Sequence, residues 1–144
     1  MDTLVAEEAY DTMASGSFGT AVNCMDGRVQ SPVADWVKIN YGVQYVDMVT
    51  EAGPDGILAH GPAHLVEHIR QRVLVSTGPH ESRVVIVAGH SGCAGNAVPD
   101  EQHRADVQAA MRTLAAWRLP VQIVGLFANE FGAIEVVGRL DAPM

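Results

Sequence analysis

The 144-residue sequence contains only two cysteines, Cys24 and Cys93, and no apolar run long enough to span a membrane. So few cysteines argue against a disulfide scaffold. Residues 1–8 show neither the basic region nor the apolar region of a secretory signal. We therefore expect a cytoplasmic protein in a reducing compartment, where two free thiols indicate metal binding or catalysis.

Basic residues are also scarce. Nine Lys and Arg stand against 17 Asp and Glu, which gives a formal net charge of −8. This charge disfavours nucleic acids and anionic membranes as partners, so a small-molecule substrate is favoured. The length and a hydrophobic content of 48% suit one compact domain. We expect a single domain over residues 1–144, with residues 1–16 as a short N-terminal helical arm.

The hydrophobic pattern alternates between short β-branched runs and longer segments with helical spacing. This alternation predicts an α/β domain with a mainly parallel sheet. Glycines and a proline predict a loop over 51–56, and Ser31-Pro32 is typical of a helix start. The predicted strands are 18–23, 44–49, 83–88 and 121–127, with an edge strand at 133–140; the predicted helices are 32–41, 62–75 and 101–118.

Both cysteines lie in short motifs that directly follow predicted strands. One motif is Cys24-Met25-Asp26-Gly27-Arg28, and the other is His90-Ser91-Gly92-Cys93. Ligands of open α/β sheets bind outside the carboxyl ends of the strands, where the strand order reverses, so one crevice can collect both motifs. Two thiolates and one imidazole form a zinc set whose fourth position stays open for water or substrate.

Other interpretations of these motifs remain. The thiols and the imidazole could be buried without a metal, or Asp26 could close the zinc site as a fourth ligand. A phosphate cradle formed by the glycines of residues 89–95 is disfavoured, because neither the Rossmann nor the P-loop spacing is present.

Three histidines, His60, His64 and His68, repeat every four residues and would form one stripe on a helix. A solvated helix face is the commoner explanation for such a stripe, while a second metal site or a proton shuttle stays open.

The motifs Cys-x-Asp-x-Arg and Gly-His-x-x-Cys resemble those of the β-class carbonic anhydrases, and residues 45–53 resemble that family's second strand and Ala-Gly turn. The likeness covers roughly residues 18 to 140. It implies a Rossmann-like three-layer fold with a mainly parallel four-stranded sheet plus a C-terminal edge strand. It also implies zinc ligation by Cys24, His90 and Cys93, with Asp26 and Arg28 as the paired carboxylate and guanidinium beside the metal.

The resemblance implies a carbonate dehydratase that hydrates CO2 reversibly to bicarbonate by a zinc-bound hydroxide. Asp26 would accept the proton of that hydroxide in a hydrogen bond, and Arg28 would orient Asp26 through a two-pronged bond. A related zinc hydrolase of carbonyl sulfide or carbon disulfide, or a non-catalytic zinc-binding homologue with a closed site, remains an alternative. A homodimer or a higher even oligomer is expected, and the exposed edge strand at 133–140 favours such pairing.

Overall fold

The computed structural model describes residues 17–143, so the expected helical arm of residues 1–16 lies outside the described residues. Five strands form one sheet in the order β2-β1-β3-β4-β5. The first four are parallel, and β5 runs antiparallel to β4 at the edge, which confirms the predicted sheet. The strands are β1 (Phe18–Cys24), β2 (Tyr45–Glu51), β3 (Val84–His90), β4 (Gln122–Ala128) and β5 (Ile134–Leu140).

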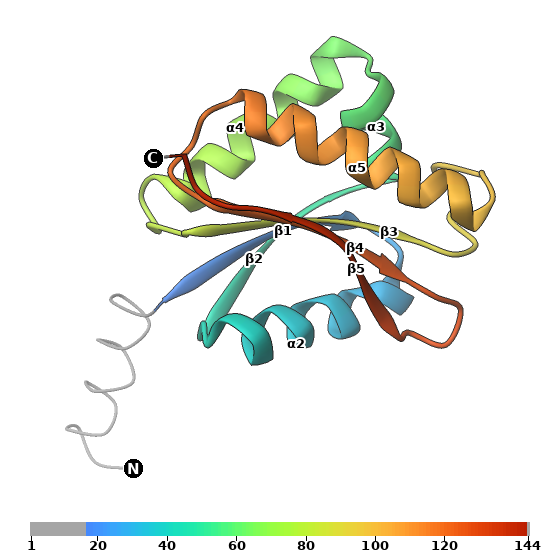
Figure 1. Cartoon of the computed structure of the whole chain (residues 1–144), viewed down its shortest axis with the longest axis horizontal. Helices are drawn as coiled ribbons and strands as arrows, with labels where there is room; N and C mark the ends of the chain where they lie inside the picture. The colour runs from blue at the N-terminus through green and yellow to red at the C-terminus, as the bar shows by residue number, and fades with distance from the viewer. Residues whose placement is uncertain (1–16, 144) are drawn as a thin grey trace.

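Helices cover both faces of the sheet and complete three layers (Figure 1). One face carries a single long helix, and three helices cover the other. Within residues 17–143, no helix combines the length and apolar character needed to cross a membrane. The helices are α2 (Gln30–Tyr41) on the first face and α3 (Pro54–His60), α4 (Ala63–Thr77) and α5 (Asp100–Ala116) on the second, and a 3₁₀ turn, η1 (Gly27–Val29), precedes α2.

The core lies on both sides of β3, which is buried along its whole length. Ile69 of α4 and Val107 of α5 belong to the cluster on one face, and Val33 and Val37 of α2 belong to the cluster on the other. All four side chains are fully buried. Burial of such a side chain stabilises the fold by about 1.5–3 kcal/mol. A β-branched strand with two covered faces is the usual centre of a parallel sheet.

The predicted loop over residues 51–56 is wrong, because helix α3 begins at Pro54. Gly53 precedes it with a left-handed backbone (φ +65°), a conformation that glycine adopts without strain. Proline suits the first helical position because its missing N–H would have no partner there. The pattern of glycine and proline therefore marks the start of a short helix.

The expected start of the helix over 32–41 is also wrong. Helix α2 begins at Gln30, directly after η1, so Ser31 does not cap it and Pro32 lies inside its first turn. Proline is tolerated there because the first-turn N–H groups lack intrahelical partners in any case.

The prediction that the three histidines form one stripe on one helix is wrong as well. His60 ends α3, whereas His64 and His68 lie on α4, and Gly61 separates the two helices. The three side chains therefore belong to two helices.

Candidate metal centre

The site lies where the strand order reverses. β1 pairs with β2 on one side and with β3 on the other. Cys24 is the last residue of β1, and His90 is the last residue of β3. Parallel neighbours end at the same edge of a sheet, and the loop after β3 brings Cys93 back to that edge. The structure thus brings together the three residues that the sequence marks as candidate ligands.

The ligand atoms of Cys24, His90 and Cys93 all lie within 4.8 Å of one another, and each residue is at most 4% exposed. The two sulfurs are 3.8 Å apart. Two thiolates bound at about 2.3 Å to one tetrahedral zinc ion would be separated by about the same distance. The geometry of the sulfurs therefore fits a zinc ion.

The imidazole also suits a metal ligand. His90 Nδ1 donates a hydrogen bond to the Ser91 carbonyl oxygen at 2.9 Å. In the neutral ring Nε2 is then the nitrogen with the free lone pair. Nε2 is buried and has no hydrogen-bond partner in the structure. A buried polar atom without a partner is costly, and a metal ion would satisfy it.

Burial raises the pKa of the Cys93 thiol to about 11, although the backbone N–H groups of Asn96 and Gly95 act to lower it. The neighbouring Cys24 also acts to raise this pKa. Two thiolates so close together need a cation between them to stay ionised. The donor set therefore has the chemistry of a metal site.

Asp26 and Arg28 form the expected two-pronged ion pair. Asp26 Oδ1 accepts from the Arg28 backbone N–H at 2.9 Å and from Nε at 3.0 Å, and Oδ2 accepts from Nη2 at 2.6 Å. These hydrogen bonds hold the pKa of Asp26 well below its usual range. Arg28 Nη2 also donates to the Gly92 carbonyl oxygen at 3.3 Å, which ties the two motifs together.

The loop that carries the second motif, which we call the metal loop (residues 89–96), lies against the turn between β2 and α3. A Cβ atom on Gly53 would come within 2.6 Å of the Gly95 carbonyl carbon. Only glycine allows so close an approach. The Ala52-Gly53 turn is therefore part of the support of the site, a role that the sequence alone did not reveal.

Two pockets flank the sheet at opposite ends of the strands. The pocket beside His90 has a volume of about 40 Å³ and is lined in part by Asn129, Glu130 and Gly132, which follow β4. It has room for a molecule of a few atoms. Sequence reasoning missed these three residues, although they follow a strand that ends at the same edge.

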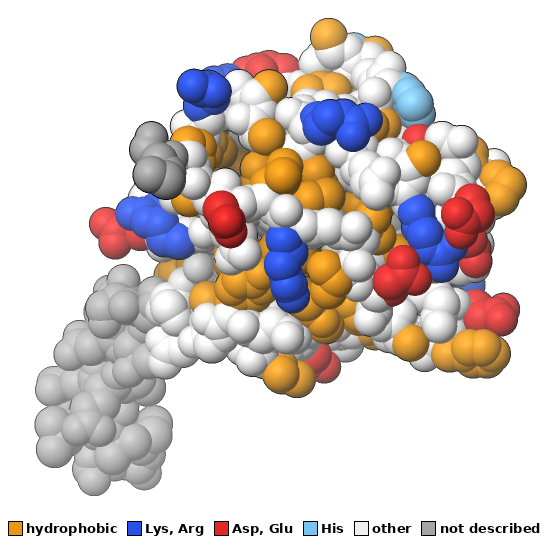
Figure 2. Space-filling view, viewed as in Figure 1, with side chains coloured by type: hydrophobic (Ala, Val, Ile, Leu, Met, Phe, Trp, Pro, Cys, Tyr) orange, Lys and Arg blue, Asp and Glu red, His pale blue; other side chains and the backbone are white. Residues whose placement is uncertain are grey.

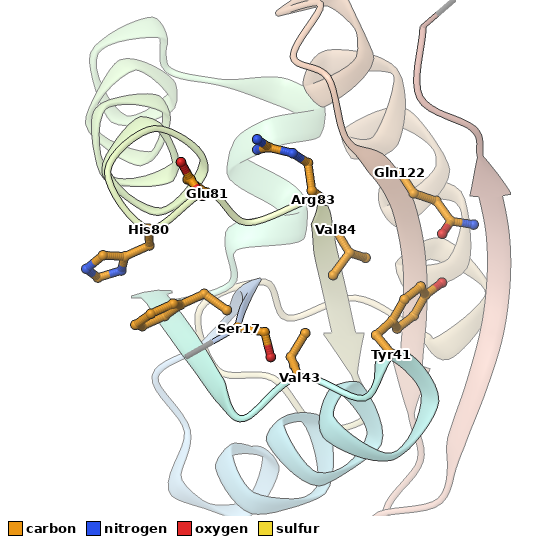
Figure 3. Close-up of a pocket in the computed structure, with 9 residues that line it drawn as sticks. Ser17, Tyr41, Val43, His80, Glu81, Arg83, Val84 and Gln122 are labelled. Atoms are coloured by element: carbon orange, nitrogen blue, oxygen red, sulfur yellow. The ribbon is translucent and has the colours of Figure 1, made fainter. Parts of the chain in front are cut away.

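A larger pocket of about 500 Å³ lies at the other end of the strands (Figure 3). Tyr41 and Val43, from the connection between α2 and β2, lie on one side of it, and His80, Glu81 and Arg83 lie on the other. Its lining includes none of the three candidate metal ligands.

The histidines of α3 and α4 make different contacts. His60 Nε2 donates to Asp106 Oδ1 at 2.9 Å. The rings of His64 and His68 meet edge to face, with centroids 6.2 Å apart. Among residues 17–143, His, Cys, Asp and Glu side chains gather at metal-binding distances only at the candidate metal centre.

The fold and the site together define an α/β protein with a candidate metal centre built from two thiols and an imidazole. Residues 14–138 match the model of the family described as "Putative carbonic anhydrase". The chain belongs to this family, which confirms the resemblance seen in the motifs. No curated protein matches the chain significantly.

Solved structures share this fold at low sequence identity. A tetrameric β-carbonic anhydrase from Sordaria macrospora has a TM-score of 0.59 at 12% identity, covering 94% of this chain and 93% of its own. The Coccomyxa β-carbonic anhydrase in complex with acetazolamide has a TM-score of 0.59 at 11% identity, covering 96% and 86%. A carbon disulfide hydrolase in its apo form has a TM-score of 0.51 at 13% identity, covering 92% and 86%. The fold is therefore that of the β-carbonic anhydrases.

Proposed function

We propose that the chain is a zinc-dependent carbonic anhydrase that interconverts CO2 and bicarbonate. Cys24, His90 and Cys93 would hold one zinc ion. The observation that carries this proposal is the convergence of the three buried donor atoms within 4.8 Å in a member of the family. A zinc ion bound there would lower the pKa of a water molecule and supply hydroxide near neutral pH.

The residues of the chain would orient the reactants. Because the pKa of Asp26 is lowered by its bonds to Arg28, its carboxylate is ionised at neutral pH and acts as an acceptor. It would accept a hydrogen bond from the nucleophile and so direct the nucleophile's lone pair at CO2. Arg28 would hold Asp26 away from the metal through its two-pronged bond. The small pocket beside His90 would admit CO2.

Stopped-flow CO2 hydration by zinc-loaded protein tests the activity, and elemental analysis tests the metal. We expect one zinc per chain and a rate well above that of the buffer. Protein that is purified without chelator and contains no zinc would overturn the metal centre. Stoichiometric zinc without hydration would leave the metal centre intact and reject the activity.

A second candidate function is the hydrolysis of carbon disulfide or carbonyl sulfide, which the fold shared with a carbon disulfide hydrolase supports. Both substrates are linear triatomic molecules that the same nucleophile can attack at carbon. Sulfide release should be measured in parallel with CO2 hydration on the same zinc-loaded sample. Faster sulfide release at equal substrate concentration would favour this function.

A non-catalytic closed site is a third interpretation of the same ligands. Asp26 on the metal at neutral and alkaline pH, seen by metal K-edge absorption spectroscopy as an added oxygen ligand, would favour it.

We also infer that the protein forms a homodimer or a higher even oligomer in the reducing cytoplasm. β5 lies at the edge of the sheet, and its Val136 and Leu140 are each 39% exposed. Figure 2 shows hydrophobic side chains at the surface where β5 lies in front in Figure 1. An exposed apolar edge strand favours pairing between chains. Light scattering should give an even multiple of the chain mass, and a monomer at micromolar concentration would contradict the inference.

A further inference from the structure

A buried carboxylate on α5 lies next to the metal loop. Asp106 is 2% exposed and accepts three side-chain hydrogen bonds. Its Oδ2 accepts from Asn96 Nδ2 at 2.9 Å, and its Oδ1 accepts from Gln102 Nε2 at 2.8 Å and from His60 Nε2 at 2.9 Å. Burial acts to raise the pKa of Asp106, but the three hydrogen bonds outweigh it and the net pKa is lowered. The buried group is therefore an anion whose charge is satisfied by its donors.

The three donors differ in what they connect. Gln102 lies one turn away on the same helix, and His60 is an exposed residue at the end of α3. Asn96 belongs to the metal loop, three residues after Cys93. Its backbone N–H and that of Gly95 act to lower the pKa of the Cys93 thiol. Asn96 thus joins the carboxylate on α5 to the loop that carries the candidate metal ligand Cys93.

Asn96 is held from the opposite side by α3. A Cβ atom on Gly56 would lie 2.8 Å from Asn96 Cγ, and one on Gly53 would lie 2.7 Å from the Asn96 backbone nitrogen. Asn96 is half-buried and lies between the start of α3 and the carboxylate on α5. Because these contacts are close, a change in the side chain of Asn96 would shift the backbone of the metal loop.

We propose that Asp106 is a positioning residue for the metal centre. By fixing the side chain of Asn96, Asp106 holds the backbone of the metal loop in place and so positions the Cys93 thiolate for a metal ion. Groups that orient metal ligands commonly change affinity by about 10–100-fold. The inference rests on the proposed metal centre.

The test compares the zinc affinity of four proteins by competition with a chelator: the parent chain, Asn96→Ala, Asp106→Ala and Gln102→Ala. Asn96→Ala removes the link to the loop and leaves Asp106 with two donors, which keeps the test valid if Asp106→Ala does not fold. Gln102→Ala is the matched control because it removes a different donor from the same carboxylate. We expect affinity to fall about 10–100-fold in the first two variants and to be unchanged in the control. The double variant Asn96→Ala/Asp106→Ala should bind no more weakly than either single variant, since both remove one link.

A second readout separates positioning from general destabilisation. In the cobalt-substituted protein, the sulfur-to-cobalt charge-transfer band should shift in Asn96→Ala and Asp106→Ala but not in Gln102→Ala. An unshifted band, unchanged affinity in Asn96→Ala, or an equal loss in Gln102→Ala would overturn the proposal. A parent chain that binds no metal would overturn the metal centre itself, whereas failure of the variants alone would overturn only the role of Asp106.

Discussion

The two ends of the parallel strands offer different chemistry, and the end with the smaller pocket carries the candidate site. At the carboxyl end, a pocket of about 40 Å³ adjoins His90, and two buried thiols lie beside it. At the other end, a pocket of about 500 Å³ is lined by Tyr41, His80 and Arg83 (Figure 3). The larger volume at the other end therefore does not mark the site.

The difference lies in which polar atoms already have partners. In the larger pocket, His80 Nδ1 bonds Asp47 at 2.6 Å, and Arg83 donates to the Ser82 carbonyl oxygen. At the carboxyl end, His90 Nε2 is buried without a partner. A buried atom that lacks a partner carries an uncompensated desolvation cost, and here two thiols converge on it as further candidate metal ligands. Four predictions test this contrast.

The largest effect is expected from Cys93→Ala, which removes one of three candidate metal ligands. The variant should no longer bind one zinc ion per chain, and its rate of CO2 hydration should fall to that of buffer without protein. Elemental analysis and stopped-flow kinetics measure both quantities. Arg83→Ala, in the larger pocket, is the control and should keep both. Zinc retained at full affinity in Cys93→Ala would break the contrast between the two ends.

A smaller loss is expected from Arg28→Ala, which frees the Asp26 carboxylate to compete for the metal. The variant should keep its zinc but lose about 10–100-fold in hydration rate. Arg28→Lys should rescue only part of the rate, because an ammonium group cannot make the two-pronged bond.

The matched control for Arg28 is Arg70→Ala, which removes another arginine–carboxylate pair, with Glu67, on the surface of α4. It should leave the rate unchanged. Undiminished turnover in Arg28→Ala would show that Arg28 has no such role.

Gly53→Ala should destabilise the fold by about 2–5 kcal/mol, because it adds left-handed strain and overlap with the metal loop. Gly42 provides the comparison, since it has nearly the same φ (+63° against +65°), but a Cβ atom added there would meet nothing within 4 Å. Gly42→Ala should therefore cost only about 1–2 kcal/mol. Urea unfolding gives both values, and chelator competition should show weaker zinc binding in Gly53→Ala alone. Equal costs in the two variants would show that the loop moves aside freely.

The smallest effect is expected from His80→Ala in the larger pocket. Its ion pair with Asp47 is partly exposed, and such pairs contribute about 0.2–1 kcal/mol. Urea unfolding should show a loss within that range, and zinc affinity should match that of the parent. A marked loss of zinc affinity would mean that the two ends are coupled through the sheet.

Much of this architecture was predictable from local patterns. The apolar run of β3 and the helical spacing of α5 are each decided within one segment, since burial on two faces or on one stripe shows in the residue order. The candidate ligands were predictable for a similar reason. Cys24 and His90 end predicted parallel strands, and parallel strands end at one edge.

The start of α3 was misread because glycine and proline favour both loops and helix starts. The packing of the metal loop against Gly53 selects the helix here, and that contact joins segments about 40 residues apart in the sequence. The prediction of one histidine stripe is wrong for a related reason. Gly61 breaks the helical period, and His60 turns to a partner on α5.

By itself, the sequence determined the five strands and the three longer helices, the residue types at the carboxyl edge and the bias toward metal chemistry. Only the tertiary structure decided which polar groups became buried and which partners they found. Asp55 pairs with His103 at 2.7 Å, and Asp106 pairs with Asn96. Nothing in the local sequence distinguishes these carboxylates from exposed ones. Their burial depends on which segments the fold brings together, because a buried charge is tolerated only where donors from other elements surround it.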